Sequence, residues 1–366
     1  MMNPFVEDGY LIPEVSVNKL RLAMAQAPND IRGKAALDII SGAVFIERMD
    51  SLFTELGIRA YHADRQRRFV ELFDDPCGRV KAEALLQKLG KNLGHILLAL
   101  KHGSGAREEI RPEWTDEQWE YWHKLDVVYL SGGLSYGLIG ERLMLAAEEL
   151  FEHTGRPYTL KLAKNSEYLP LIGAYQRGAR EAGSAGVSES IIVLDFGHTY
   201  VKRGFVCDGA FTVLDRVESI ARYMYDDESE DVSAQLLNDF IIGVILDTCA
   251  KASRAGKQGK PSAIASVSIA NYINHGGIYP HRGEYGRLSR LPVNYEEYLS
   301  RELSRRLGHE FQTILIHDGT AAAYGIDNPA GERAAVITLG TGLGVGFCDM
   351  RDWPYKKFQR KKENHV

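Results

Sequence analysis

The sequence lacks paired cysteines and long apolar runs. Its four cysteines lie far apart and form no C-x-x-C pair: Cys77, Cys207, Cys249 and Cys348. This spacing excludes a disulfide framework and a zinc-finger pattern, so we expect reduced thiols in a cytoplasmic protein. No stretch reaches 18 consecutive apolar residues, so no membrane-spanning helix and no membrane partner are expected.

The chain also lacks a large excess of charge of either sign. Its 44 basic and 49 acidic residues give a net charge of −5, which argues against a dedicated nucleic-acid or anionic-membrane surface. Residues 1–13 contain Glu7 and Asp8 and no basic segment leading into an apolar one, unlike a secretory signal. The 366 residues, 45% of them hydrophobic, are enough for two or three domains with sizeable cores.

The first third of the chain is predicted to be mostly helical. Apolar spacing indicates helices at 17–26, 34–56, 81–100, 139–153, 231–252 and 295–307. Thr115 is the expected N-cap of a further helix, because Asp116 and Glu117 would occupy its first turn and interact favourably with the helix dipole.

Apolar strands are expected mainly in the second half of the chain. They lie at 126–130, 191–194, 201–207, 210–214, 265–273, 313–316 and 334–339. The pair Asp208-Gly209 predicts a hairpin turn. Segments 177–190 and 253–262 are predicted to be a linker and a loop, and 355–362 a frayed end.

Four expected strands stop at a polar, glycine-rich turn, near Gly132, Asp195, Asp318 and Gly340. Ligands gather at the carboxyl ends of strands in open sheets. These four turns are therefore the candidate functional segments.

The turn Asp195-Phe-Gly-His-Thr-Tyr-Val-Lys202 has the groups that a phosphate needs. Gly197 allows a tight turn that exposes backbone N–H groups, Thr199 adds a hydroxyl donor and Lys202 adds charge. Asp195 would lie where a carboxylate can hold a hydrated Mg²⁺. The alternative is the start of a hairpin with a capping aspartate.

The segment Gly340-Thr-Gly-Leu-Gly-Val-Gly346 is richer in glycine. Alternate glycines let the backbone approach a polyphosphate, and Thr341 can bond to an oxygen. The alternative is a glycine-rich strand pair packed against a helix. Because glycine destabilises a strand interior, four of them at alternate positions favour the phosphate interpretation.

The two remaining turns are less specific. Asp318 stands between a strand and a helix start rich in small residues, where a carboxylate could take a proton from a substrate hydroxyl. The alternative is a simple helix N-cap. Gly132-Gly-Leu-Ser135 before a helix could open a nucleotide pocket, but such a segment alone does not decide this.

Together these segments resemble the ASKHA superfamily of sugar kinases, actins and chaperone ATPases, and within it the ROK (repressor, open reading frame, kinase) family of sugar kinases. Residues 195–202 and 339–346 resemble the family's two phosphate motifs. Residues 316–323 resemble its catalytic segment, 129–135 its adenosine motif and 171–174 its closing helix.

The order of these segments differs from that of ordinary members, in which the adenosine motif and closing helix come last. The chain therefore resembles a circular permutant whose old termini are joined by a linker at 181–190. The resemblance implies an α/β fold of two ribonuclease-H-like lobes with an interlobe cleft. One lobe would comprise 1–180 and 334–366, with a helical insert, and the other 191–333.

The resemblance implies an ATP-dependent kinase for a hydroxyl of a sugar or sugar derivative, with ATP and Mg²⁺ as cofactors. Asp318 would be the catalytic residue and Asp195 would hold Mg²⁺ through water. The nucleotide and phosphate contacts would be Asp195, Gly197, Thr199, Lys202, Gly340, Thr341, Gly342, Gly344, Gly132, Gly133 and Ser135. The substrate contacts would be Asn271, Asn274, His275, Glu284, His317 and Asp38.

Departures from the family pattern keep alternatives open. His198 and His317 replace a usual glycine and asparagine, and the Gly-Glu-x-Gly-His sugar motif is not visible. The cysteine cluster for zinc is missing, so no zinc is expected. The alternatives are a catalytically impaired sugar- or nucleotide-binding protein, or another ASKHA ATPase such as an acyl kinase. A homodimer is an expectation by analogy with relatives.

Overall fold

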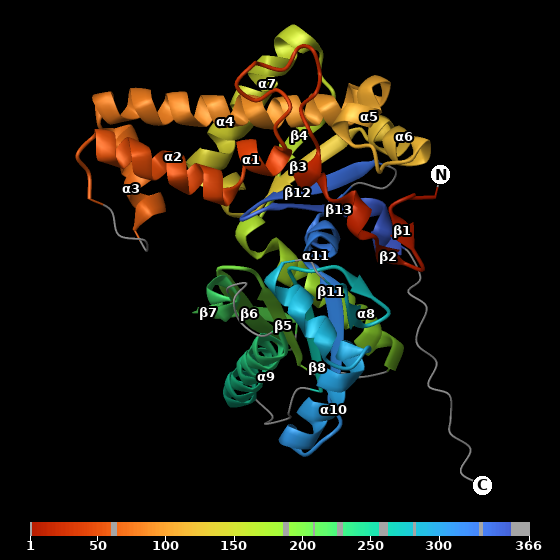
Figure 1. Cartoon of the computed structure of the whole chain (residues 1–366). Helices are drawn as coiled ribbons and strands as arrows, with labels where there is room; N and C mark the ends of the chain where they lie inside the picture. The colour runs from red at the N-terminus through yellow and green to blue at the C-terminus, as the bar shows by residue number, and fades with distance from the viewer. Residues whose placement is uncertain are drawn as a thin grey trace. The chain divides into compact units, whose positions relative to one another are not determined.

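The computed structural model describes residues 2–59, 64–185, 190–207, 209–224, 230–255, 263–280, 283–328 and 332–352. The chain is an α/β protein that divides into two compact units (Figure 1). Unit 1 comprises Met1–Pro4, Glu14–Leu169 and Ile326–Cys348. Unit 2 comprises Phe5–Pro13, Pro170–Gly325 and Asp349–Val366.

Unit 1 contains a four-stranded sheet in the order β13-β12-β3-β4. The strands are β3 (Val127–Ser131), β4 (Thr159–Leu162), β12 (Ala334–Leu339) and β13 (Leu343–Phe347). Strands β12, β3 and β4 are parallel, whereas β13 runs antiparallel to β12 as the second arm of a hairpin. Every residue of β3 is buried, as expected of a central parallel strand covered on both faces.

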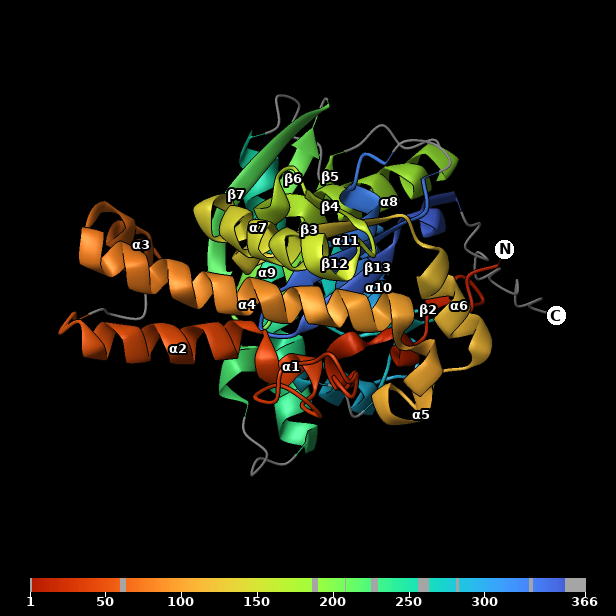
Figure 2. The same cartoon turned by 90° about the horizontal axis from the view of Figure 1, so that it is seen from above.

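The helices of unit 1 come mainly from the first 154 residues. They are α1 (Ala36–Ile39), α2 (Gly42–Glu55), α3 (Arg65–Glu71), α4 (Pro76–His102), α5 (Arg107–Ile110), α6 (Asp116–Lys124) and α7 (Gly137–Thr154). In Figure 2, α2 runs alongside the long helix α4. Thr115 caps α6 as predicted, in a reciprocal capping box with Gln118.

Helices α4 and α7 pack with their backbones unusually close. A Cβ atom on Gly90 of α4 would overlap the backbone oxygen of Leu143 and the side chain of Ala146 on α7. One turn further along α4, a Cβ on Gly94 would lie 2.9 Å from Leu150. Gly90 is therefore required by the close crossing of these helices, whereas the Leu150 side chain beside Gly94 can shift.

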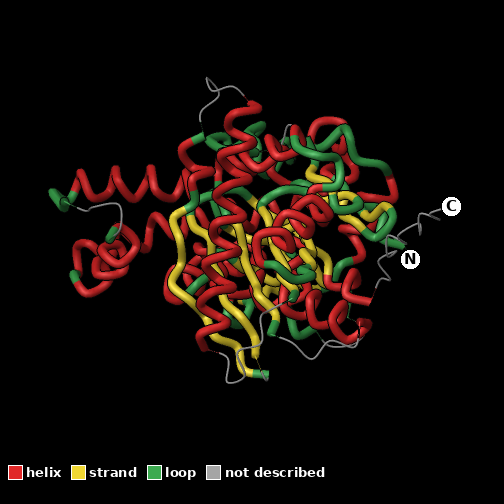
Figure 3. The backbone as a smooth tube through the Cα atoms, turned by 90° about the horizontal axis from the view of Figure 1, so that it is seen from below, coloured by secondary structure: helices red, strands yellow, loops and turns green. Residues whose placement is uncertain are grey.

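Unit 2 contains a five-stranded sheet in the order β11-β8-β5-β6-β7. The strands are β5 (Ile191–Phe196), β6 (Tyr200–Cys207), β7 (Ala210–Glu218), β8 (Ile264–Ile269) and β11 (Gln312–His317). Of these strands, only β6 runs opposite to the others. Figure 3 shows them side by side in yellow. In the parallel register Ile269 pairs with both Phe196 and His317, so β5, β8 and β11 end at one edge.

Helices cover both faces of this sheet. Helix α9 (Glu230–Ala255) packs against the face of Ile192, Leu194 and Phe196, and α8 (Leu169–Ala185) lies against the other face, where Gly178 approaches Ile191. Residues Asp231–Arg254 are long and apolar enough to cross a membrane by length and composition alone. Because 56% of that window is buried in the unit, it behaves as a core helix.

Helix α10 (Tyr295–Leu307) protects the edge strand β11. Three side chains spaced four residues apart along α10 accept hydrogen bonds from backbone N–H groups at this edge. Glu296 accepts from Leu315 at 2.7 Å, Ser300 from Thr313 at 2.9 Å and Ser304 from Phe311 at 2.9 Å. The edge N–H groups are thereby satisfied and cannot pair with another chain.

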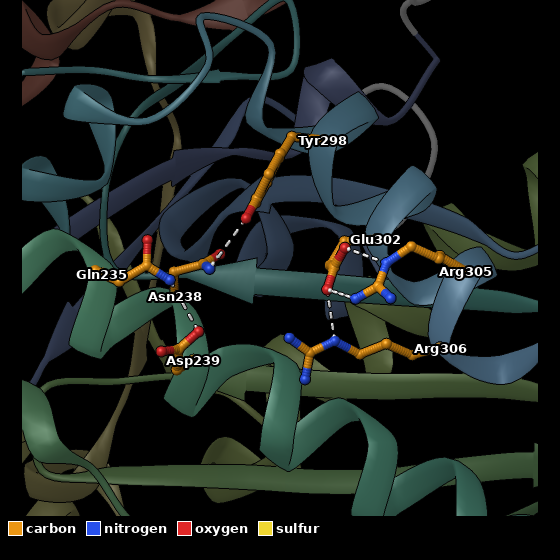
Figure 4. A network of polar contacts seen from close by, with 7 residues as sticks. All are labelled: Gln235, Asn238, Asp239, Tyr298, Glu302, Arg305 and Arg306. Atoms are coloured by element: carbon orange, nitrogen blue, oxygen red, sulfur yellow. Dashed lines mark hydrogen bonds and ion pairs between the residues drawn. The ribbon is translucent and has the colours of Figure 1, made fainter.

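The remaining face of α10 is polar. Figure 4 shows Tyr298 of α10 accepting a hydrogen bond from Asn238 of α9 at 3.3 Å. The same view shows Glu302 bonded to Arg305 and Arg306, whose hydrogen bonds lower the pKa of Glu302 to about 2. Such exposed ion pairs contribute little to stability.

Short elements complete the fold. The small strands are β1 (Val6–Glu7), β2 (Tyr10–Leu11), β9 (Ile273–Asn274) and β10 (Gly277–Ile278). Helix α11 (Asp318–Gly325) follows β11 directly. The 3₁₀ helices are Pro13–Val15, Val17–Lys19, Leu72–Asp74, Gly103–Ala106, Gly133–Ser135, Ser166–Tyr168, Ile220–Tyr223, Glu284–Arg290 and Cys348–Asp352.

Most predicted helices and strands are confirmed, but the helix predicted at 17–26 is wrong. Only Val17–Lys19 form a 3₁₀ turn, after which Arg21 bridges Ala35 in extended conformation. Leu20 and Leu22 are buried while Arg21 between them is exposed. This alternation has a period of two, which is typical of extended chain.

The linker predicted from 177 is also wrong as far as residue 185, because helix α8 runs to Ala185. Gly178 serves packing, since a Cβ there would lie 3.0 Å from Ile191 and 3.1 Å from Ser266. Helix α9 likewise extends to Ala255, into the predicted loop. The rest of that loop (256–262), residues 186–189, Asp208 of the hairpin and the end at 355–362 lie outside the described residues.

The boundaries between the two units lie at other residues than the predicted boundaries between the lobes. The division falls between Leu169 and Pro170 and between Gly325 and Ile326, so all of α8 after its first residue belongs to unit 2. Residues Phe5–Pro13 also belong to unit 2. The helical insert from Glu14 onward lies in unit 1, with the glycine-rich hairpin of β12 and β13.

Two helix-interior glycines provide a matched test of the packing. We expect Gly90→Ala to destabilise the protein by about 1–3 kcal/mol, because the new methyl group has no space. The same change at Gly243 in α9 meets no atom within 4 Å. It should stabilise the protein by about 0.5–1 kcal/mol through helix propensity. Denaturant unfolding of both variants measures the difference, and equal effects would contradict the close crossing.

The half-buried carboxyl group of Glu296 predicts a pH dependence of stability. Burial raises its pKa from the ordinary 4.5 to about 7. Its contribution to stability is therefore full below the ordinary pKa and is lost as the pH rises through about 7. Glu296→Gln, which keeps an acceptor for Leu315, should raise the melting temperature at about pH 8 by a few degrees and change it less at about pH 5.

The matched control for this variant is Glu297→Gln. Glu297 is the exposed neighbour of Glu296 on the same helix. Thermal unfolding of the three proteins at both pH values provides the measurement. An equal shift in both variants would mean that the carboxyl group of Glu296 has no special role.

Candidate active site

The candidate site of unit 2 lies where three parallel strands end. Asp195 is the fifth residue of β5, Ser268 the fifth of β8, and Asp318 follows the last residue of β11. The register pairs Asp195 with Ser268 on one side and with Lys202 of β6 on the other. Strand pairing therefore brings these polar groups together at one edge of the sheet.

Asp195 is a buried carboxylate with two polar partners. Only 6% of the residue is exposed. Ser268 Oγ donates to its Oδ1 at 2.9 Å, and Lys202 Nζ lies 3.5 Å from its Oδ2. A buried charge needs such partners to offset its lost hydration. Asp195 and Lys202 are thus placed together by the pairing of β5 with β6.

Asp318 is the first residue of α11 and has a strongly altered pKa. Burial raises the pKa of its carboxyl group to about 7, and the negative charge of Asp195 adds to the rise. The Gly319 N–H, which donates to Oδ1 at 2.7 Å, and the charge of Lys202 act in the opposite direction. The side chain keeps 32% exposure, so a ligand can reach it. A reachable carboxyl group with a pKa near neutrality suits proton transfer.

His317 is hydrogen-bonded to Asp318 and orients its carboxyl group. Its Nδ1 accepts the backbone N–H of Thr320 at 3.3 Å, so the ring proton is on Nε2, which donates to Asp318 Oδ1 at 3.0 Å. Burial lowers the pKa of His317 to about 3, so the ring is neutral at neutral pH. The ring also stacks on Tyr272 at 4.5 Å. Both ring nitrogens therefore form hydrogen bonds within the protein, as expected of a residue that positions Asp318.

Helix α11 is fixed by a backbone contact with α8. A Cβ on Gly173 of α8 would overlap the backbone oxygen of Ala321 on α11. Residues Gly319 to Tyr324 of α11 are all buried. The small residues that follow Asp318 thus let two helices approach closely, and Asp318 is held at the end of a rigid element.

The turn after β5 is supported by a buried tyrosine. The Tyr285 hydroxyl donates to the backbone oxygen of Gly197 at 3.1 Å and lies 3.0 Å from Ser219 Oγ. The N–H of Gly197 is used within the turn, 3.2 Å from the oxygens of Asp195 and Tyr200. The N–H of Gly197 itself is therefore engaged within the protein.

Glu284 lies against the same turn. Its Oε2 is 3.2 Å from Nδ1 of His198, which directly follows Gly197. Burial raises the pKa of Glu284, but the hydrogen bond with His198, a backbone hydrogen bond and the charges of His198 and Arg287 together leave the pKa below its usual value. Glu284 is therefore a carboxylate at neutral pH, beside the predicted phosphate turn.

The other predicted substrate residues of unit 2 differ in position. Asn271 is 4% exposed and follows β8, at the edge that carries Asp195 and Asp318. Asn274 is exposed in the β9–β10 hairpin. His275 has a positive φ of 49° and lies 3.5 Å from Asp8, with Tyr10 beside its ring.

In unit 1, two of the predicted glycine-rich turns lie together. Gly132 has a φ of +92°, and a Cβ there would lie 2.7 Å from the backbone oxygen of Leu339, the residue before Gly340. The turn at Gly340–Gly342 is held by Gly42, whose N–H donates to the oxygen of Gly340 at 2.6 Å. Asn18 supports it further by accepting the N–H of Leu343 at 2.8 Å.

The remaining predicted residues of unit 1 have varied surroundings. Thr341 is exposed at the tip of the β12–β13 hairpin, and Gly344 pairs with Thr338 within it. Ser135 is buried and donates to the backbone oxygen of Ser131 at 2.8 Å. Gly133 accepts from Gln66 at 3.2 Å, and Asp38 is exposed on α1.

Sequence reasoning missed three supporting residues, namely Ser268, Tyr272 and Tyr285. Ser268 had a usable signal, because Ser266 and Ser268 alternate with apolar residues in a strand that is otherwise suited to the core. Polar side chains at such positions need a partner. Tyr272 and Tyr285 had no comparable signal, since aromatic residues are common in cores.

The carboxyl groups of Asp195 and Asp318 suit Mg²⁺ better than a metal ion whose ligands are all protein side chains. Among the described residues no group of three or more His, Cys, Asp or Glu side chains could hold a metal. Mg²⁺ is usually held by one or two carboxylates, with waters and substrate phosphates as the other ligands. Asp195 and Asp318, close enough for one charge to raise the pKa of the other, provide such carboxylates.

Comparisons with known proteins give little further information. No protein-family model matches the sequence. No curated protein matches it either. Among solved structures, the chain is similar to the crystal structure of ethanolamine utilization protein EutJ from Carboxydothermus hydrogenoformans. The match is 16% identical, covers 55% of this chain and 65% of that chain, and has a TM-score of 0.28. The chain thus spans less than two thirds of that protein, and so low a TM-score carries no conclusion.

The role of His317 can be tested through the titration of Asp318. His317→Phe keeps a ring to stack on Tyr272 but removes the donor to Asp318 Oδ1. We expect the pKa of Asp318 to rise by about one unit, because the lost hydrogen bond stabilised the ionised form. Carbon-13 NMR titration of labelled aspartate carboxyl groups measures it.

The control variant is His317→Asn, whose amide can still donate. It should restore a pKa close to that of the natural protein. An unchanged pKa in His317→Phe would show that the histidine does not act on Asp318.

Proposed function

We propose that this protein is an ATP-dependent phosphotransferase that phosphorylates a hydroxyl group of a sugar or sugar derivative. The observation that carries the proposal is the carboxylate pair of Asp195 and Asp318 at the carboxyl edge of the parallel strands. One member has a pKa of about 7 and remains reachable, and Lys202 lies beside the pair. These are the groups that phosphoryl transfer to an alcohol requires.

A similarity between the two units supports the proposal. In unit 2, β5 forms an antiparallel hairpin with β6 and lies parallel to β8 and β11. In unit 1, β12 forms an antiparallel hairpin with β13 and lies parallel to β3 and β4. Each predicted phosphate motif thus occupies the hairpin turn after the corresponding strand.

This correspondence also favours the permuted ASKHA arrangement implied by the resemblance. The sheet of unit 1 combines strands β3 and β4 from the first half of the chain with β12 and β13 from its last part. All five strands of the unit 2 sheet lie between them in sequence. A sheet built from two segments that lie on either side of the other sheet in sequence is what a permuted two-lobe protein requires.

In the proposed reaction, the oxygen of the acceptor hydroxyl bonds to the γ-phosphorus of ATP, and Asp318 accepts the proton of that hydroxyl. The bond from this phosphorus to the bridging oxygen breaks, and ADP leaves. His317 orients the carboxylate through Nε2. Lys202 and the Thr199 hydroxyl are proposed to bind phosphate oxygens. Positioning and charge neutralisation supply most of the rate.

Mg²⁺ would be held by Asp195, through water, and when bound it would neutralise charge on the phosphate oxygens. Ser268 fixes the orientation of the Asp195 carboxylate for this purpose. Asn271 and Glu284 remain the proposed acceptor-binding residues near the pair, because an amide and a carboxylate can bond to several hydroxyl groups.

Coupled detection of ADP release over a panel of hexoses, amino sugars and polyols tests the proposal. Asp318→Asn should reduce turnover by about 10²- to 10⁴-fold, because the amide cannot accept the proton. ATP affinity should stay within about threefold, since the substitution spares the phosphate turns. In the natural protein, turnover should fall as the pH drops through about 7, where Asp318 becomes protonated.

The matched control is Asp327→Asn, which changes an exposed aspartate outside the site. It should leave turnover unchanged. Equal turnover in Asp318→Asn and the natural protein would refute the assigned base. ATP binding without turnover on any member of the panel would refute the kinase and favour a nucleotide-binding protein of the same fold.

A further inference from the structure

Unit 1 contains a cavity of about 500 Å³ that no part of the proposed function uses. Its lining residues come from three segments of the chain and are Lys19, Arg21, Ala35, Ile110, Arg111, Pro112 and Glu113. The volume lies within the range of small-molecule sites, roughly 300–1,000 Å³. None of these residues belongs to the proposed nucleotide, metal or acceptor sites.

Backbone hydrogen bonds join the three segments that form the cavity. The N–H of Arg21 donates to the oxygen of Ile110 at 2.9 Å, and Arg21 bridges Ala35 in antiparallel fashion. Ile110 is fully buried. The positions of the lining side chains are therefore set by the fold of unit 1 rather than by one exposed loop.

The charged side chains around the cavity are mainly cationic. Lys19, Arg21 and Arg111 face a single carboxylate, Glu113, which leaves an excess of two positive charges. The Arg111 side chain is only 4% exposed, with its guanidinium over the ring of Trp114 and 3.3 Å from the Glu113 carboxylate. Glu113 is 56% exposed and can turn towards water. The Arg111–Glu113 ion pair is neutral overall, so the excess comes from Lys19 and Arg21, whose positive charges an anion in the cavity would offset.

We propose that this cavity binds a small phosphate monoester. A monoester carries about −1.5 to −2 charges at neutral pH, which matches the excess of positive charge. Arginine guanidinium groups bind phosphate oxygens in a bidentate manner. Ala35 and Pro112 offer apolar surface to the organic part of the ligand, whereas a free phosphate would leave this surface uncovered.

Isothermal titration calorimetry with phenyl phosphate tests the proposal, with phenyl sulfate as the singly charged analogue. Phenyl phosphate should bind saturably, and phenyl sulfate about tenfold more weakly because it carries one negative charge. Lys19→Gln should weaken phenyl phosphate binding about five- to tenfold, and Lys19→Gln with Arg21→Gln further. Inorganic phosphate should bind more weakly than phenyl phosphate.

Lys34→Gln is the matched control, since Lys34 is an exposed neighbour outside the cavity lining. It should leave the affinity unchanged within about twofold. Asp318→Asn should also leave it unchanged, which separates this site from the proposed active site. Circular dichroism of each variant checks that it has folded.

Three results would overturn the proposal. One is no saturable binding of phenyl phosphate up to about 10 mM. The second is equal affinity in the natural protein and the folded Lys19→Gln and double variants. The third is that ATP displaces phenyl phosphate while Lys19→Gln leaves the affinity for phenyl phosphate unchanged. This result would assign the binding to the proposed nucleotide site.

Discussion

The parallel register of β5, β8 and β11 is the constraint on which the candidate site depends. It brings the ends of three strands to one edge and thereby places Asp195 and Asp318 close together. Two carboxylates at short range repel each other, and burial adds a further cost. The surrounding residues offset part of this cost: Ser268, Lys202, His317 and the Gly319 N–H each contact one of the two carboxyl groups. The residual cost is expressed as the raised pKa of Asp318.

The position of Asp318 depends in turn on an edge strand. β11 lies at the margin of the sheet, and Asp318 follows it directly. An unsupported edge strand is free to fray or to pair with another chain. Helix α10 prevents this because Glu296, Ser300 and Ser304 accept hydrogen bonds from alternate backbone N–H groups of the edge. Helix α8 fixes the following helix through the contact of Gly173 with Ala321. A second half-buried carboxyl group, that of Glu296, is thus part of what positions the first.

Much of this site could be predicted from the sequence, because strand ends and turn glycines have strong local signals. Asp195, Lys202 and Asp318 were identified as candidates since each adjoins an apolar strand. Their contacts could not be predicted, because the register of distant strands depends on the whole sheet. His317 shows the difference. As a residue beside a catalytic candidate it was predicted to contact substrate, whereas the structure engages both of its ring nitrogens.

Glycine shows where sequence reasoning fails, since one residue type serves at least two purposes in this chain. Gly132 adopts a positive φ in a turn, whereas Gly90, Gly173 and Gly178 lie in helices and permit close packing. The sequence around 177–190 has the composition of a linker, yet its described part up to Ala185 is helical and packs on the sheet. A glycine in the sequence shows only that a position has no side chain. Only the surrounding structure shows whether the glycine permits a turn or the close approach of a neighbouring backbone.

The roles of the four glycines of the segment 340–346 therefore cannot be assigned by composition. The contact of Gly42 with Gly340 gives the turn a structural role, whereas its place at the end of β12, beside Gly132, favours phosphate binding.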